Sequence, residues 1–70
     1  MRFIKLWEWY YHNGGYLTKP LMCNIDDISC IAEDTSGHVD GTDVTMKNGK
    51  FHIVKETYQE IVDMITEVDR

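Results

Sequence analysis

Three histidines and two cysteines are the residues of this chain best suited to bind a metal or to activate a substrate. Structural zinc sites pair cysteines about two to four residues apart and add closely spaced histidines. Six residues separate Cys23 from Cys30, and the sequence contains no His-x-x-x-His motif. His12, His38 and His52 fall in an expected turn, loop and strand, without the spacing of ligands. We therefore expect no metal site, no cofactor and two reduced cysteines.

Carboxylates crowd one polar segment, where Asp34, Asp40 and Asp43 follow one another closely. Calcium loops of the EF-hand type need alternating Asp or Asn ligands, a central glycine and a closing glutamate. The segment DTSGHVDG, residues 34–41, does not provide these in the required order. We expect a solvated acidic loop here rather than a calcium site.

The chain also lacks the usual signatures of catalysis. It contains no Gly-x-Ser-x-Gly, no glycine-rich phosphate loop and no Cys–His signature. Asp26-Asp27 and Glu33-Asp34 are neighbouring carboxylates, but adjacent residues of an extended chain point to opposite faces. A domain of 70 residues also has little depth for a pocket that excludes water. We expect no catalytic residues and a protein that is not an enzyme.

An aromatic face on the first expected strand, residues 2–11, is the first candidate binding surface. Both faces of this strand are apolar, whereas a sheet with a single covering helix buries only one face fully. Part of the strand should therefore be exposed, and aromatic residues commonly anchor protein interfaces. The sequence leaves open which face is buried. One face carries Phe3 and the candidate binding residues Trp7, Trp9 and Tyr11, and the other carries Ile4, Leu6 and Tyr10.

An acidic ridge on the expected C-terminal helix is the second candidate binding surface. Four acidic residues follow one another at helical spacing, so they fall within an arc of about 60° roughly opposite the apolar side. No lysine at i+4 neutralises them, and such a ridge attracts a basic partner. The alternative is an ordinary solvated helix face. The four residues are Glu56, Glu60, Asp63 and Glu67.

The elements that position these residues are five strands and one helix. Runs rich in β-branched and aromatic residues predict the strands. Asn-Gly signals predict tight turns at residues 12–15 and at Asn48-Gly49, and Pro20 restricts the second strand to an edge or a bulge. A single turn is expected around residues 25–28. The predicted strands span residues 2–11, 16–23, 28–33, 42–47 and 50–55.

The last element begins at a capping box. The hydroxyl of Thr57 accepts a hydrogen bond from an amide of the first turn, and the Glu60 carboxylate reaches back. An apolar stripe at helical spacing follows, made by Ile61, Ile65 and Val68 with flanking apolar residues. A lone helix of this length is marginal, so we expect it to lie on the sheet.

Size and charge narrow the possible functions. The chain has 70 residues, enough for one domain with a small core, and a formal net charge of −5. Net negative charge argues against sequence-independent nucleic-acid binding, which needs cations along the phosphates. No apolar run approaches the roughly 18–20 residues of a membrane span, and the charged N-terminus is not that of a signal peptide. We expect a cytoplasmic protein whose partner is another protein with a basic surface.

Between Leu21 and Ile65 the chain carries an ordered set of core and turn residues. An Asn and an Ile precede a short acidic strand, and a Thr-x-Val strand, an Asn-Gly turn and a Val-Lys-Glu-Thr entry to a helix follow. This set resembles the FlbD/SwrD-type family of small flagellar and swarming-motility proteins. The matching residues are Asn24, Ile28, Ile31, Val44 to Met46, Asn48-Gly49, Val54-Lys55-Glu56-Thr57 and Glu60-Ile61.

The resemblance implies a small, non-catalytic bacterial accessory protein connected with flagellar motor power and swarming. Two segments depart from the family pattern. The first hairpin carries WEWYYHNGG, residues 7–15, where the family has a shorter, basic Leu-Asn-Gly stretch. The loop at residues 34–41 is also longer. These departures fall on segments expected to contact partners, and they also fit an offshoot with a new target, such as one carried by a phage.

Together these observations predict a single α+β domain, residues 1–70. We expect a small, curved, mainly antiparallel sheet of five strands, or a partly open barrel, with one C-terminal helix. The expected function is a non-enzymatic protein-interaction module that is either flagellar-accessory-like or a phage-type inhibitor with an acidic surface imitating nucleic acid. A homodimer is also plausible because edge strands with aromatic residues favour association. The alternative is a nucleic-acid-binding regulator similar to LytTR-type domains, which order strands, an Asn/Asp-Gly turn and a helix in the same way.

Overall fold

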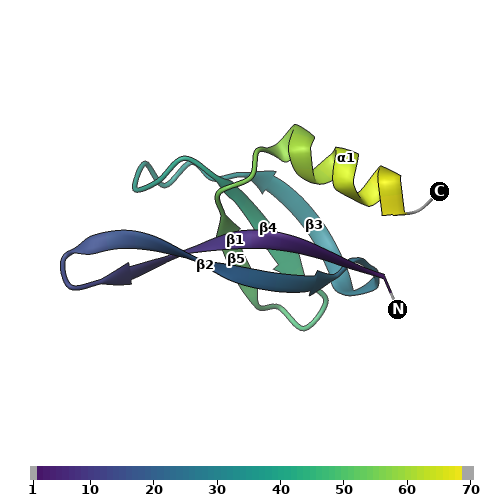
Figure 1. Ribbon diagram of the computed structural model, residues 1–70, viewed down its shortest axis with the longest axis horizontal. Helices are drawn as coiled ribbons and strands as arrows, with labels where there is room; N and C mark the ends of the chain where they lie inside the picture. Colours follow the sequence, from purple (N-terminus) through teal and green to yellow (C-terminus); the bar gives the residue numbers. More distant parts are fainter. Residues whose placement is uncertain (1, 69–70) are drawn as a thin grey trace.

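The computed structural model describes residues 2–68, and within them the chain forms one antiparallel sheet and one α-helix (Figure 1). The strand order is β2-β1-β5-β4-β3. This arrangement confirms the predicted α+β class with a partly open sheet of five strands. The elements are β1 (Phe3–His12), β2 (Gly15–Asn24), a 3-10 turn (Ile25–Asp27), β3 (Ile28–Glu33), β4 (Thr42–Met46), β5 (Phe51–Val54) and α1 (Tyr58–Val68).

β1 and β2 form a long hairpin that projects beyond the rest of the molecule (Figure 1). Its two-residue turn places Asn13 at φ 50° and Gly14 at φ 81°, the conformation of a type I′ turn. Every residue of β1 pairs with one of β2, from Phe3 opposite Asn24 to His12 opposite Gly15. The projection gives the molecule extents of 40 × 20 × 20 Å.

Pro20 lies in the middle of β2 and does not interrupt the ladder. A two-residue turn makes the closing pair hydrogen-bonded, and such pairs then alternate along the hairpin. Pro20 lies opposite Trp7 in a pair that is not hydrogen-bonded. Consistent with this, Trp7 directs its carbonyl away from β2 and accepts the Lys55 amide at 2.7 Å. The proline nitrogen therefore faces the open edge of β2, where a missing donor disfavours pairing with a further strand.

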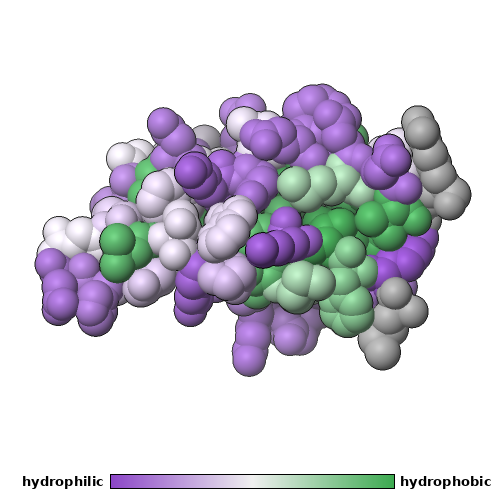
Figure 2. Space-filling view, in the orientation of Figure 1, coloured by the Kyte–Doolittle hydropathy of each residue, from purple (hydrophilic) through white to green (hydrophobic). Residues whose placement is uncertain are grey.

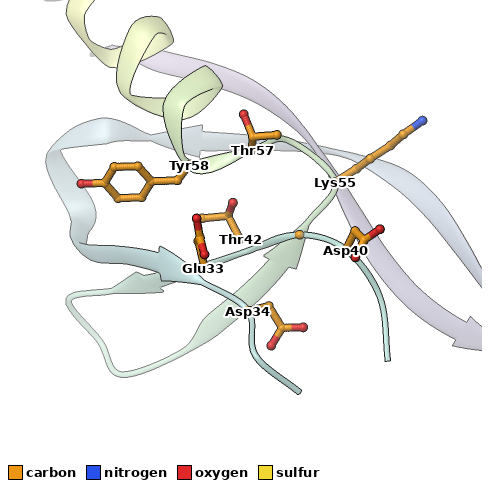
Figure 3. A pocket seen from close by; sticks show the side chains of 8 residues that line it. Glu33, Asp34, Asp40, Thr42, Lys55, Thr57 and Tyr58 are labelled. Carbon is orange, nitrogen blue, oxygen red and sulfur yellow. The ribbon is translucent and has the colours of Figure 1, made fainter. Parts of the chain in front are cut away.

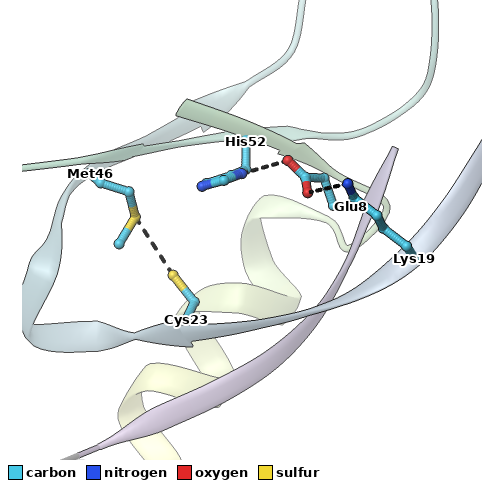
Figure 4. A network of polar contacts seen from close by, with 5 residues as sticks. All are labelled: Glu8, Lys19, Cys23, Met46 and His52. Atoms are coloured by element: carbon cyan, nitrogen blue, oxygen red, sulfur yellow. Dashed lines mark hydrogen bonds and ion pairs between the residues drawn. The ribbon is translucent and has the colours of Figure 1, made fainter. Parts of the chain in front are cut away.

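The sheet curves strongly between the hairpin and the remaining strands. β1 pairs with β5 at Glu8 opposite Val54, and the two strands then diverge. On the concave side, the Cys23 thiol of β2 lies 3.7 Å from the Met46 sulfur of β4, although these strands are not neighbours in the sheet (Figure 4). The sheet therefore closes part of the way around its own core, as in an open barrel.

The core lies on this concave side, which we call the inner face. Side chains alternate along each strand, and paired residues of neighbouring strands share a face. Aliphatic residues of three strands meet the helix there, together with the fully buried Thr42 of β4. The buried cluster comprises Ile4, Leu6, Cys23, Val44, Val54 and Ile61.

α1 covers the inner face and contacts β1 and β3. Its predicted capping box is present: the Thr57 hydroxyl accepts the Glu60 amide at 3.1 Å, and the Glu60 carboxylate accepts the Thr57 amide at 3.2 Å. Thr57 is therefore the cap, and the helix itself begins at Tyr58. Of the predicted apolar stripe, Ile61 is fully buried, whereas Val68 is 37% exposed, so burial weakens toward the helix end.

Two further glycines shape the chain around β4. Gly49 has φ 88° in the predicted Asn-Gly turn, which joins β4 to β5. Gly41 precedes β4, and a Cβ atom there would lie 2.2 Å from the Val54 carbonyl oxygen. Any larger residue would have to separate the end of the loop from β5. No predicted strand end differs from the observed one by more than one residue; the third strand agrees at both ends, and the last spans Phe51–Val54 rather than residues 50–55.

Candidate protein-binding surface

The side of the sheet opposite α1, which we call the outer face, carries large apolar side chains that no described helix or strand covers. Trp7 and Tyr11 of the candidate set lie on it, and the residues paired with them from β2 share it. Ile4 and Leu6 of the same strand are buried on the inner face, which settles the question that the sequence left open. The exposed fractions are 44% for Phe3, 39% for Trp7, 66% for Tyr11, 42% for Tyr16, 60% for Met22 and 63% for Phe51.

Figure 2 shows one side of the molecule in the orientation of Figure 1. Hydrophobic atoms gather beneath α1 and over the right half of the β1–β2 hairpin. Paler residues of intermediate hydropathy lie beside them in the middle of the hairpin, and hydrophilic residues cover its tip and the upper side of α1. The acidic residues lie on α1, which covers the inner face, so they and the outer face lie on opposite sides of the sheet.

Contacts between side chains hold the outer face in a defined shape. The rings of Tyr11 and Tyr16, which are paired across the hairpin, meet edge to face with centroids 5.3 Å apart. The ammonium of Lys5 lies 4.8 Å from the centre of the Trp7 ring, a cation–π contact. These contacts restrict the rotamers before any partner arrives, which lowers the entropy cost of binding.

Trp9, the remaining aromatic candidate, has a structural contact of its own. Its indole N–H donates to the Asp40 carbonyl at 3.1 Å, and the side chain is only half-buried. Tyr16 lies against His38 of the same loop, with ring centroids 6.3 Å apart. Trp9 and Tyr16 thus attach the loop at residues 34–41 to the hairpin, a role that strand alternation alone does not reveal.

The acidic candidates do not form one ridge of four. Glu60, Asp63 and Glu67 lie on exposed positions of α1. The Asp63 carboxylate accepts a hydrogen bond from the side-chain amide of Gln59 at 3.0 Å, and Glu60 belongs to the capping box. The placement of Glu56 on the helix was wrong, because this residue precedes α1, which spans Tyr58–Val68.

Glu56 instead completes the hydrogen bonding of β1. Its carboxylate accepts the Trp7 amide at 2.9 Å, in the place where a further β5 residue would offer a carbonyl. Its own carbonyl accepts the Thr42 hydroxyl at 2.8 Å. The Glu56 carboxylate takes the place of a backbone carbonyl here because the chain leaves the sheet to enter α1. Helical periodicity cannot distinguish such a residue from the first turn of the helix.

A shallow pocket of about 230 Å³ lies where β3, β4, β5 and α1 meet (Figure 3). Three carboxylates and one lysine line it, but several of its polar groups have structural partners. Asp34 accepts the Ser36 hydroxyl at 2.7 Å and the Ser36 amide at 3.2 Å, which shapes the loop, and the Thr42 hydroxyl is bonded as described. The lining residues are Glu33, Asp34, Asp40, Gly41, Thr42, Lys55, Thr57 and Tyr58.

A polar network crosses the open end of the inner face (Figure 4). The Glu8 carboxylate lies 2.5 Å from His52 Nδ1 and 3.9 Å from the Lys19 ammonium. A carboxylate only accepts, so this contact places a proton on Nδ1. The network joins β1, β2 and β5 beyond the aliphatic core. A second hollow, of about 390 Å³, lies beside His52 and Met46 at the β4–β5 turn.

The two cysteines are free, as the sequence predicts. Burial, and to a smaller degree the Asp27 carboxylate, raise the pKa of the Cys23 thiol above its ordinary value. This thiol therefore stays protonated at neutral pH and is a poor nucleophile. Cys30 is exposed on β3. Within residues 2–68, no three histidine, cysteine or acidic side chains come together as a metal site would require.

No family model matches the chain, and no match was found among curated proteins or solved structures. Among residues 2–68, no helix has the length and apolar character needed to cross a membrane. The FlbD/SwrD resemblance remains a hypothesis that these comparisons leave untested.

Proposed function

We propose that this chain is a non-catalytic interaction module that acts by binding other proteins. The observation that carries the proposal is the outer face, on which Trp7, Tyr11, Met22 and Phe51 are exposed together. Small soluble domains rarely leave a contiguous apolar surface uncovered unless a partner occupies it. Tryptophan and tyrosine are also the residues that most often dominate the energy of protein interfaces.

The acidic side of α1 offers a second, electrostatic contact for a basic partner. Asp63 and Glu67 point to solvent on the helix, and the whole chain has a net charge of −5. Such a surface raises the rate of encounter with a cationic partner more than it raises the affinity. Because α1 lies on the side of the sheet opposite the outer face, the two surfaces offer separate contacts, and the outer face offers the larger apolar area.

The biological setting that fits this module is that of a bacterial or phage accessory protein. The FlbD/SwrD resemblance favours a flagellar or swarming role. The acidic balance also supports a phage-type inhibitor whose carboxylates imitate nucleic-acid phosphates. Both settings require a protein partner, no cofactor and no metal, and both place the module in the cytoplasm.

Affinity capture from lysate of the source cells, with matched surface variants, tests the proposal. The outer-face variant is Trp7→Ala/Tyr11→Ala, because Trp9 also holds the loop at Asp40. The helix variant is Asp63→Lys/Glu67→Lys, which leaves the Glu60 capping box intact. We expect a partner that wild type captures and that the outer-face variant loses. Circular dichroism first shows that each variant is folded.

A matched control separates a specific surface from general stickiness. Leu17 is 47% exposed but lies at the hairpin tip opposite Tyr10, outside the outer face. Leu17→Ala should therefore retain the partner. If all variants capture the same proteins as wild type, neither surface is the binding site and the proposal is wrong.

The LytTR-like alternative makes the opposite prediction for DNA. Binding to duplex DNA should then be measurable at low salt and weaken steeply as salt increases. We expect no such binding, because the carboxylates outnumber the cations by twelve to seven. Fluorescence anisotropy with a labelled duplex at about 50 mM and about 200 mM salt distinguishes the two functions.

A further inference from the structure

We infer that the outer face is occupied by a second copy of this chain, which packs sheet against sheet as a two-fold dimer. This inference rests on the proposed function, because it identifies one partner of the proposed binding surface. The area of the face, its charge and the chemistry of the open strand edge each favour a second copy.

The area of the face is close to what a stable dimer needs. Large aromatic side chains contribute roughly 200 Å² each, so the exposed fractions of the six outer-face residues leave roughly 600 Å² of apolar area. A standard protein interface buries about 800 Å² per partner. The outer face supplies most of this area, and neighbouring half-buried residues such as Trp9 and Ile53 surround it.

The charge distribution selects a second copy as the occupant. Two chains of net charge −5 repel each other, and they can approach closely only where few carboxylates meet. On the outer side of the hairpin, the described residues at alternate positions of β1 and β2 include no acidic side chain. Their one charged member is Lys5, which lies over Trp7. The neighbouring strands add one carboxylate to the outer face, that of Asp43, which already accepts the Thr45 hydroxyl at 3.1 Å. A strongly basic partner therefore finds little complementary charge on this side.

The open edge of β2 determines how the two copies meet. Pro20 directs its nitrogen to this edge and offers no donor, so continuing the sheet into a second copy loses a hydrogen bond at the middle of the strand. Packing face to face loses none. Two sheets packed in this way lie about 10 Å apart with their side chains interdigitated. The same patch is used on both copies, as two-fold symmetry requires.

Sedimentation equilibrium of the full chain over a range of concentrations tests the inference. The monomer mass is 8.2 kDa, and we expect twice this mass at high concentration. Met22→Glu and Phe51→Glu place a carboxylate on the outer face at positions that are 60% and 63% exposed, so folding should tolerate them. Each should raise the dimer dissociation constant by at least about tenfold, the effect of about 1.4 kcal/mol. Leu17→Glu is the matched control and should leave the constant unchanged.

The salt dependence gives a second readout. Added salt screens the repulsion between two acidic chains, so an apolar dimer should tighten from about 50 mM to about 500 mM salt. A dimer held by ion pairs would weaken instead. A monomer at every concentration, or a dimer that both glutamate variants leave unchanged, would overturn the inference. If the chain is monomeric and the outer-face variant still loses a captured protein, the proposed function stands without the dimer.

Discussion

The two faces of strand β1 differ in chemistry although a single stretch of ten residues, Phe3–His12, makes both. The inner face presents aliphatic side chains, of which Leu6 is fully buried, and the outer face presents aromatic side chains that are 39–66% exposed at Phe3, Trp7 and Tyr11. Aliphatic residues pack densely against one helix. Tyrosine and tryptophan combine a large apolar ring with a polar group, so they tolerate solvent in the free protein and can be buried when a partner binds. The difference fits the proposed function, in which one face stabilises the fold and the other binds a partner.

The largest effect should come from the inner face. Leu6→Ala removes a fully buried side chain from the middle of the core and should lower the free energy of unfolding by about 3 kcal/mol. Trp7→Ala, one residue away on the outer face, should cost less than Leu6→Ala, because the Trp7 side chain is 39% exposed and that of Leu6 is fully buried. Urea denaturation at concentrations where the chain is monomeric measures both.

Similar losses for Leu6→Ala and Trp7→Ala would contradict this difference between the two faces, because the outer aromatic residues would then belong to the fold as much as the inner ones do. Phe51→Ala provides a second control on the outer face, at a side chain that is 63% exposed. It should behave like Trp7→Ala.

The next effect should come from Glu56, which lies where the sheet gives way to α1. Glu56→Ala leaves the Trp7 amide without its acceptor and should lower the free energy of unfolding by about 1–3 kcal/mol. Glu56→Gln keeps an acceptor oxygen at the same position and should cost clearly less. The same urea titration compares the two. Equal losses would mean that the hydrogen bond to Trp7 does not stabilise the fold.

Glu56 also shows what helical spacing in the sequence cannot predict. Periodicity assigned it to an acidic helix ridge, since residues 56, 60, 63 and 67 share helical spacing. Helical spacing alone does not show where the chain leaves the sheet. In the structure it leaves the sheet at Glu56, whose carboxylate accepts the Trp7 amide. Local signals succeeded where one residue decides the geometry, as in the Asn-Gly turns and the capping box at Thr57. The strand alternation of β1 was predictable, but its buried side was not, because both faces are apolar.

Long-range contacts were equally inaccessible from the sequence. The attachment of the loop to the hairpin depends on Trp9 and Asp40, which are 31 residues apart. The curvature that brings Cys23 to Met46 depends on β1 pairing with both β2 and β5. Which face stays exposed follows from this curvature and from the placement of α1, so the sequence narrowed the candidate surface to one strand but not to one face of it.

A smaller loss of stability is expected from changes in α1, the helix that covers only the inner face. Thr57→Ala removes the hydroxyl that accepts the Glu60 amide and should lower the free energy of unfolding by about 1 kcal/mol. Thr66→Ala is the matched control, because the Thr66 hydroxyl only donates to the Val62 carbonyl within the helix. Alanine favours helix formation, so Thr66→Ala should be neutral or slightly stabilising. Thermal unfolding followed by circular dichroism should rank the two variants in this order.

The smallest effect should come from the cysteines, which report on the two sides of the sheet. Cys23 is buried on the inner face, whereas Cys30 is exposed on β3, where it pairs with Thr45. At neutral pH an alkylating reagent should modify Cys30 at once and Cys23 only as fast as the protein opens. Mass spectrometry of the intact chain over time measures both rates. Equal rates in the folded protein would mean that the inner face is open to solvent.

The raised pKa of Cys23 predicts how the free energy of unfolding changes at alkaline pH. Burial and the Asp27 carboxylate raise the folded-state pKa of Cys23, so the unfolded chain releases its proton first as the pH rises. The thiol contributes no pH dependence below its unfolded pKa, about 8.5, and stability falls as the pH rises from there toward the folded pKa. Cys23→Ala should remove this part of the alkaline loss, and Cys30→Ala should retain it. Urea titrations at neutral and alkaline pH test this, and an unchanged alkaline loss in Cys23→Ala would show that the buried thiol is not its cause.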